Sequence, residues 1–371
     1  MSTRRTLSDA ERRAWLRLAR TDNVGPTTFA ALIARFGSAA EAIPAASRMA
    51  RRGGGDLRTP SEAEAAEEIA RLANLGGRII ACIEPDFPDG LFALDPRPPI
   101  IAALGDLSHL RRDMVAIVGA RNASALGIKF ANRLAMELGA AGLVVASGLA
   151  RGIDSAAHRG AIETGTVAVV AGGIDVIYPP ENQSLYEEIA RKGVLIAEMP
   201  FGMAPLPRHF PRRNRLSSGL SRGVAVIEAA ERSGSLITAN FALEQGREIF
   251  AVPGSPLDPR SKGANRLIRE GATLTETADD IIAVLRPILG HAFGDTGQPE
   301  SHAPLADAQL VEREADTIRA LVEEKLSPAP VEVDELIRQC EAPAALVLTV
   351  LLELELAGRA QRYPGGRIAW K

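Results

Sequence analysis

The segment HFPRRNR at 209–215 gathers residues that can bind a polyanion, and no Asp or Glu occurs anywhere in 204–222. Its candidate side chains are Phe210, Arg212, Arg213, Asn214 and Arg215. Guanidinium groups bind phosphate through forked donors, and an aromatic ring beside them can stack on a base. The pattern indicates a ligand that carries phosphates and unpaired bases. On its own, an arginine-rich surface segment that forms ordinary ion pairs explains it equally well.

A second set of candidates lies in glycine-containing turns that follow aliphatic runs. Arg121 comes two residues after the run VAIVG, which ends at Gly119, and SGLARG occupies 147–152. Small residues let a phosphate approach the backbone closely, and the carboxyl ends of parallel strands are where ligands bind. The chain has neither GxGxxG at Gly119 nor GxxxxGK[ST], so a dinucleotide or nucleoside triphosphate site is not supported. A tight turn is enough to explain each glycine taken alone. Arg121 differs, because it places a fixed positive charge at the carboxyl ends of the strands.

No catalytic set can be assembled from the sequence. Asp154, His158, Glu198 and Glu228 lie near expected strand or helix ends, but nothing pairs a base with a nucleophile. Neither GxSxG nor HExxH occurs, so we expect no catalytic residue, no metal and no cofactor. For His158 we expect helix packing or a structural hydrogen bond. The run SGS at 233–235 predicts either a helix cap alone or an anion site at that helix terminus.

The elements that must position these residues form a repeating β-α pattern in the central region, 76–285. Near-continuous Val, Ile and Ala runs bounded by glycine are typical of parallel strands buried on both faces. The predicted strands are 115–119, 143–147, 167–173, 194–199, 223–230 and 248–254, with 78–83 and 100–105 as further strands at the entry. The predicted helices are 127–141, 155–164, 182–192, 212–221 and 234–246. The sequence therefore predicts an α/β fold with a doubly wound, Rossmann-like, mostly parallel sheet.

Smaller regions flank this sheet. Residues 1–75 have helical periodicity, and 1–58 hold eleven Arg against five acids. The turn DNVGPTT at 22–28 before FAALIARFG resembles a helix-hairpin-helix unit, which either holds a DNA backbone or serves as a packing module. RRGGGD at 51–56 is expected to be a flexible loop. A Gly- and Pro-rich linker is expected at 286–312, followed by a winged-helix domain of three helices and a hairpin at 313–371.

Composition limits the class of protein. The 371 residues carry a formal net charge of −3, so nucleic-acid binding requires a local patch. Cys82 and Cys340 are far apart and form no CxxC, which argues against a disulfide framework and fits a reducing compartment. No apolar run approaches membrane-spanning length, and the N-terminus lacks the apolar core of a signal peptide. We therefore expect a cytoplasmic protein with no membrane partner.

Several ordered runs carry a family resemblance. They are VAIVGARNAS, ASGLARGIDSAAHRGAI, AGGIDVIYPPENQSLYEEI, FPRRNRLSSGLS, EAAERSGSLITA, FAVPGS and SKGANRLIREGA. Between about 76 and 275 they closely resemble the DNA-processing protein A family, also called DprA or Smf. The resemblance implies a non-enzymatic protein that binds single-stranded DNA, protects incoming strands during natural transformation and loads the RecA recombinase onto them. It also implies a homodimer, with the dimer contact near the last sheet strand and the helix at 263–271.

The resemblance further implies a set of DNA-binding residues. These are Arg121, Phe210, Arg212, Arg213, Asn214 and Arg215, with Ser147, Gly148, Ser235 and Asn265 lining the same pocket. Some relatives carry a lysine in the turn after Tyr-Pro, where this chain has Pro180 and Glu181. That difference removes one possible phosphate contact.

Two other functions remain open from the residues alone. One is a nucleotide-binding or nucleotide-hydrolysing Rossmann-like enzyme of the lysine-decarboxylase-like type, although its PGGxGT-type turn is matched poorly here. The other is a sheet scaffold for partner proteins. The winged-helix region, 312–371, holds eleven acids and eight bases, and its third helix offers apolar residues and glutamates. We therefore expect that region to contact protein rather than to read a major groove.

Overall fold

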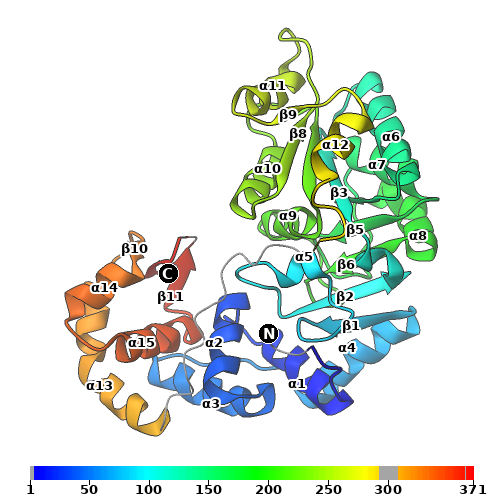
Figure 1. Ribbon diagram of the computed structural model, residues 1–371. Coiled ribbons are helices and arrows are strands. Elements are labelled where there is room, and N and C mark those ends of the chain that lie inside the picture. The colour runs from blue at the N-terminus through cyan, green and yellow to red at the C-terminus, as the bar shows by residue number, and fades with distance from the viewer. Residues whose placement is uncertain (1–3, 292–307, 364) are drawn as a thin grey trace. The chain divides into compact units, whose positions relative to one another are not determined.

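The computed structural model describes residues 4–291, 308–363 and 365–371, and divides the chain into two compact units. Unit 1 contains residues up to Thr6 together with 68–297. Unit 2 contains Leu7–Glu67 together with Gln298–Lys371, so it combines segments from the two ends of the chain. Figure 1 shows the elements of both units. Most of the predicted linker, at 292–307, lies outside the described residues.

Unit 1 is built on one nine-stranded sheet in the order β1-β2-β6-β5-β4-β3-β7-β8-β9. The strands are β1 (Gly77–Ala81), β2 (Ile100–Gly105), β3 (Met114–Gly119), β4 (Val144–Ser147), β5 (Thr166–Val170), β6 (Val194–Ala197), β7 (Gly223–Ile227), β8 (Glu248–Ala251) and β9 (Thr273–Leu274). Neighbours from β6 to β9 pair in parallel, whereas β1 and β2 are antiparallel additions beside β6. The predicted doubly wound, mostly parallel sheet is confirmed.

Helices cover both faces of this sheet. They are α5 (Asp89–Phe92), α6 (Ala125–Ala140), α7 (Ile153–Ala161), α8 (Gln183–Lys192), α9 (His209–Leu220), α10 (Gly234–Glu244), α11 (Lys262–Arg269) and α12 (Ala278–Leu285). Side chains of α9, α10 and α11 join one core cluster, and those of α6, α7 and α12 join a second. The Val, Ile and Ala strands are buried because both faces are covered. A further helix, α4 (Glu62–Asn74), precedes β1.

The strand order reverses between β3 and β7. The chain runs from β3 through β4 and β5 to β6, then returns to place β7 on the other side of β3. The two strands pair in parallel, with Gly119 opposite Ile227. In open parallel sheets the turns beyond such a switch point diverge and leave a crevice. The turns after Gly119 and after Ile227 therefore border the place where a ligand is expected.

Unit 2 combines a helical module and a winged helix. Its elements are α1 (Asp9–Ala19), α2 (Pro26–Phe36), α3 (Ala39–Arg52), α13 (Ala308–Lys325), β10 (Val331–Glu332), α14 (Val333–Cys340), α15 (Ala344–Leu356), β11 (Ala360–Tyr363) and β12 (Arg367–Trp370). The last strands form a three-stranded sheet in the order β10-β12-β11, so the predicted three helices and hairpin are confirmed. The two modules pack together within this unit, chiefly through α3 and α15.

The contact between these modules is close and charged. The Glu353 carboxylate on α15 is fully buried and forms ion pairs with Arg52, at 3.1 Å, and with Arg319. Thr28, at the start of α2, donates a hydrogen bond to the Glu355 carboxylate of α15. Asn23, in the turn before α2, donates a hydrogen bond to the Leu356 carbonyl. We define these contacts as the α3–α15 interface.

Glycine permits this close packing after α3. A Cβ atom on Gly53 would lie 2.3 Å from the Glu353 carbonyl oxygen, so only glycine fits there without a shift of backbone. RRGGGD was predicted to be a flexible loop, and for its first two residues this is wrong, because Arg51 and Arg52 form the end of α3. Gly53, which follows, is buried against α15.

Within the described residues, no single helix has the length and apolar content needed to cross a membrane. Helices α2 and α3 reach that composition only when taken together, and they are bent by 108° at the break between them.

Candidate nucleic-acid interface

The segment HFPRRNR forms the first two turns of α9 rather than a loop. Because helical residues three, four and seven apart share a face, Phe210, Arg213, Asn214 and Ser217 lie together. All four border one groove. Arg212 and Arg215 are directed elsewhere by the same periodicity. The arginines that are adjacent in the sequence therefore lie on different faces of the helix.

The groove lies at the switch point between β3 and β7 and has a volume of about 590 Å³. We call it the switch-point groove. Its polar and charged lining includes Arg121, Asn122, Asp154, Arg213, Asn214, Ser217, Arg232, Ser233, Ser235, Thr238 and Arg260. Four of these side chains are guanidiniums that come from the turn after β3, from α9 and from segments after β7 and β8. The sheet thus collects cations that are far apart in sequence.

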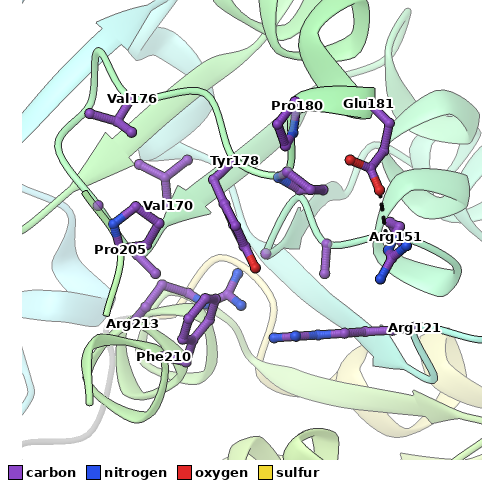
Figure 2. Close-up of a pocket in the computed structure, with 15 residues that line it drawn as sticks. Arg121, Arg151, Val170, Val176, Tyr178, Pro180, Glu181, Pro205, Phe210 and Arg213 are labelled. Atoms are coloured by element: carbon purple, nitrogen blue, oxygen red, sulfur yellow. Dashed lines mark ion pairs between the residues drawn. The ribbon is translucent and has the colours of Figure 1, made fainter. Parts of the chain in front are cut away.

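Arg121 and Phe210 form the centre of this interface. The Arg121 guanidinium carbon lies 5.1 Å from the centre of the Phe210 ring, in cation–π geometry. Tyr178 meets Phe210 edge-on, with ring centroids 5.9 Å apart and planes at 61°. Figure 2 shows Arg121 and the two rings around one opening. Within the described residues Arg121 forms no ion pair with a carboxylate, so its charge is available to a ligand.

Arg213 is a buried cation beneath this opening. Its Nη1 donates a hydrogen bond to the Val169 carbonyl at 3.0 Å, and a Cβ on Gly148 would lie 1.5 Å from the same nitrogen. Burial lowers the pKa of Arg213, and the nearby Asp154 carboxylate opposes that shift. Burial likewise raises the pKa of Asp154, while Arg213 opposes the rise. Glycine at 148 is therefore required to admit the Arg213 guanidinium.

The N-terminus of α10 borders the same groove. Ser233 is the N-cap and its hydroxyl accepts a hydrogen bond from the Ser235 amide at 3.3 Å. Asn214 reaches this turn from α9, with its Nδ2 donating to the Gly234 carbonyl at 3.3 Å. A helix N-terminus presents partial positive charge and free amides to an anion. The cap and the anion-binding interpretations of this turn are thus compatible.

Four residues implied by the resemblance lie outside the groove. Arg215 forms a largely buried ion pair with Glu198 at 2.7 Å, and Arg212 is exposed away from the groove. Ser147 is fully buried and donates to the Ile117 carbonyl at 2.6 Å, below the turn. The Asn265 amide is used in two hydrogen bonds to the Gly254 backbone. The structure thus brings together Arg121, Gly148, Phe210, Arg213, Asn214 and Ser235.

Sequence reasoning missed several residues that line the opening. These are Tyr178, Arg151, Arg232 and Arg260. Two of them carried a usable signal: Tyr178 follows β5 in a chain of only 4% aromatic residues, and Arg232 follows the switch strand β7. Arg260 lies in a loop after β8, and nothing in the sequence places it beside Arg121.

His158 has the structural role that the sequence indicates. It is fully buried, its Nδ1 lies 2.7 Å from the Thr166 hydroxyl oxygen, and burial lowers its pKa to about 3. A group of three or more His, Cys, Asp or Glu side chains that could hold a metal does not occur within the described residues.

Comparison with known proteins connects this geometry to a family. The model of DNA recombination-mediator protein A matches residues 78–286, a DprA-like N-terminal HHH domain matches 9–70, and a DprA winged helix domain matches 304–366. Protein Smf of Escherichia coli is 38% identical over 285 residues, covering 76% of this chain and 74% of that protein.

Two solved structures share the architecture. The DNA processing protein A structure from Streptococcus pneumoniae aligns with a TM-score of 0.57 and 38% identity, over 60% of this chain and 78% of that one. The Helicobacter pylori structure, described by its single-stranded DNA binding mode, aligns with a TM-score of 0.54 and 27% identity, over 58% of this chain and 99% of that one. The chain belongs to the DNA recombination-mediator protein A family, also called DprA or Smf.

Proposed function

We propose that this chain is a binding protein for single-stranded DNA, and that the switch-point groove holds the strand. The observation that carries the proposal is the convergence of Arg121, Arg232, the Phe210 ring and the N-terminus of α10 on one groove, with the buried Arg213 beneath it. Cations bind phosphates regardless of sequence, and an exposed ring stacks on any base. The related Helicobacter pylori protein, whose structure concerns single-stranded DNA binding, supports the same conclusion.

The groove favours a single strand over a duplex. Bases of a single strand are free to stack on Phe210, whereas duplex bases are already stacked. We expect little sequence preference, because the groove offers mainly cations and backbone amides. The chain acts in this proposal as a mediator rather than an enzyme.

A salt titration tests the proposal. Two guanidiniums of the groove, Arg121 and Arg232, are open to phosphates, since Arg213 is buried and Arg260 is paired with Asp258 at 2.8 Å. If both meet phosphates, the logarithm of affinity for labelled oligothymidylate falls against log salt with a slope of about −1.4. The same titration with a duplex of equal length should give weaker binding. An affinity for the single strand that does not change with salt would contradict the phosphate contacts.

The finer parts of the function also belong to this proposal. We propose that the protein protects incoming strands during natural transformation, loads RecA onto them and works in the cytoplasm, as the family resemblance implies. RecA loading is tested by the lag before RecA-dependent ATP hydrolysis begins on single-stranded DNA. The protein should shorten that lag, and the Arg121→Ala variant should shorten it less. If the protein leaves the lag unchanged, the proposal of RecA loading is contradicted, whereas the proposal of DNA binding is not.

We further propose that the chain forms a homodimer through the β9 edge of the sheet. Strand β9 ends the sheet order, and Leu274 on it is 46% exposed. Within the described residues β9 pairs with β8 alone, and a sheet edge with an exposed apolar side chain is a common pairing site. Sedimentation should show a dimer that the Leu274→Asp substitution converts to a monomer. A wild-type monomer at micromolar concentration would overturn the dimer.

The winged helix is proposed to contact protein rather than DNA. Its third helix, α15, is the element that would enter a major groove in such a domain, yet almost all its side chains are buried. Its own core covers one side and α3 covers another. The segments that pack on α15 support a role as an internal protein contact. Gel shifts with duplex DNA should therefore be unaffected by Glu355→Gln.

A further inference from the structure

Glu228 is an acid with a strained backbone beside the switch-point groove. It directly follows β7, whose last residue, Ile227, lies opposite Gly119 at the end of β3. Its φ is 51°, in the left-handed region that residues other than glycine adopt only uncommonly. Within the described residues of unit 1, the other non-glycine residue in this region is Leu149, whose side chain is fully buried. Glu228 is half-buried, so burial of an apolar side chain does not explain its conformation.

The carboxylate of Glu228 forms two hydrogen bonds at the start of α6. Its Oε2 accepts from the Ser124 amide at 2.8 Å, and its Oε1 accepts from the Ser124 hydroxyl. Ser124 is the N-cap of α6, and its hydroxyl oxygen accepts from the Gly127 amide at 2.9 Å. A Cβ atom on Gly127 would lie 2.6 Å from the Glu228 carboxyl carbon, so glycine leaves the space that the carboxylate fills. The left-handed residue and this glycine therefore serve the same contact.

This contact holds one end of the turn that carries Arg121, which connects β3 to α6. At the other end of the turn, the Ile153 amide of α7 donates to the Ala120 carbonyl at 3.2 Å. The Arg121 side chain has no carboxylate partner within the described residues, and it contacts the Phe210 ring. Because no ion pair fixes the guanidinium, its place at the groove depends on how firmly the backbone of the turn is held.

The charge of Glu228 by itself is unfavourable at this place. Glu228 is close enough to Arg260, which lines the groove, for the two charges to interact. A carboxylate at the edge of a groove that binds phosphates weakens binding by repulsion. The two hydrogen bonds to Ser124 have the opposite consequence, because they hold the turn that presents a cation. The bonds and the charge therefore predict effects of opposite sign on DNA affinity.

We propose that Glu228 is a positioning residue, which holds the turn after β3 so that Arg121 faces the strand. The inference rests on the proposed single-stranded DNA binding and gives a role in it to an acid that contacts no phosphate itself. The hydrogen bonds of the carboxylate carry this role, and its charge does not. Loss of the bonds weakens binding, whereas loss of the charge alone does not.

Two substitutions in the full-length protein separate the bonds from the charge. Glu228→Gln keeps an oxygen that accepts from the Ser124 amide and a nitrogen that can donate to the Ser124 hydroxyl oxygen. Its affinity for labelled oligothymidylate should therefore stay within about twofold of the wild-type value. Glu228→Ala removes both bonds, and the affinity should fall about 3- to 10-fold.

Glu231→Ala is the matched control for loss of an acid. Glu231 is exposed in the same segment after β7, between Ala230 and Arg232, which both line the groove. Its substitution removes the same charge, so the affinity should stay equal or rise slightly. An affinity of Glu228→Ala that equals or exceeds that of Glu231→Ala would contradict the positioning role.

A double-mutant cycle with Arg121→Ala tests whether Glu228 acts through Arg121. When residue 121 is already alanine, Glu228→Ala should cause no further loss of affinity and no further change of the salt slope. Additive losses would mean that Glu228 only stabilises α6, and the proposal would then be wrong.

Folding and the proposed function are checked separately. Glu228→Gly, which adopts a φ of 51° without strain, replaces Glu228→Ala if thermal melting shows that the alanine variant does not fold. Wild-type protein that binds no oligothymidylate would overturn the proposed function together with this inference. Salt-dependent wild-type binding that Glu228→Ala leaves unchanged would overturn the inference alone.

Discussion

In the switch-point groove, Arg121 rests on an aromatic ring and forms no ion pair within the described residues, whereas in unit 2 Arg52 and Arg319 meet the buried Glu353 carboxylate. Both regions place arginines around a helix. In unit 2 an acid buried on α15 neutralises them, so their charge stabilises packing. In unit 1 Arg121 and Arg232 face a groove with little acid, so their charge remains available to an anion. The position of carboxylates, more than the number of arginines, separates a binding surface from an internal contact.

The largest expected effect is on unit 2. Glu353→Ala should lower its free energy of unfolding by about 1–3 kcal/mol, because Arg52 and Arg319 lose a buried partner and keep only their ion pairs with Asp316. The two tryptophans of the chain, Trp15 and Trp370, both lie in unit 2, so their fluorescence follows its denaturation. Glu324→Ala, an exposed acid on α13, is the matched control and should change stability by less than about 0.5 kcal/mol. The affinity for oligothymidylate should not change. A lower affinity in Glu353→Ala would contradict the assignment of DNA binding to unit 1 alone.

Cooperativity of unit 2 gives a second check on the α3–α15 interface. Trp15 belongs to the helical module and Trp370 to the winged helix. Trp15→Phe and Trp370→Phe each leave one reporter, and both should give the same denaturation midpoint in otherwise intact protein. Two midpoints separated by more than the spread of replicates would show that the modules unfold independently.

The next effect is on DNA affinity. Gly148→Ala should weaken oligothymidylate binding about 10- to 100-fold, since its Cβ would occupy the position of the Arg213 guanidinium. Tryptophan fluorescence should report unchanged unfolding of unit 2. Unweakened binding in a folded variant would mean that Arg213 does not support the site.

A smaller effect is expected from single surface cations. Arg121→Ala should reduce the magnitude of the salt slope by about 0.7, the value for one phosphate contact with a single strand. Arg215→Ala should leave the slope unchanged and lower stability instead, because Arg215 is paired with Glu198. Equal salt slopes for Arg121→Ala and Arg215→Ala would contradict the conclusion that Arg121 contacts the strand and Arg215 does not.

The smallest effect is expected from Arg212, which is exposed on a face of α9 away from the groove. Arg212→Ala should change oligothymidylate affinity less than about twofold, as for other surface substitutions. A decrease comparable with that of Arg121→Ala would show that the strand also crosses the outer face of α9.

Much of the fold follows from local sequence patterns. The run VAIVG lies in β3 and LVVAS in β4, because continuous aliphatic residues bounded by glycine are typical of strands covered on both faces. The terminal hairpin around Gly365 and Gly366 follows from its turn residues. The short strand β9 was missed, since its two residues give no periodic signal.

The candidate site was less predictable. HFPRRNR was interpreted as one basic cluster, yet its side chains separate once helical periodicity is applied from His209. That division was available from the sequence had the helix been started three residues earlier. The ion pair of Arg215 with Glu198 was not available, because 17 residues separate them and no local rule brings them together.

The sequence by itself determined the α/β class, the strands, the winged helix and the residue types that suit a polyanion, because these depend on composition and periodicity over short windows. Only the tertiary structure decided which arginines are open to a ligand and which are paired with acids. It also joined the two ends of the chain into one unit around α15. Both depend on contacts between residues far apart in sequence, where burial removes water and makes the nearest opposite charge decisive.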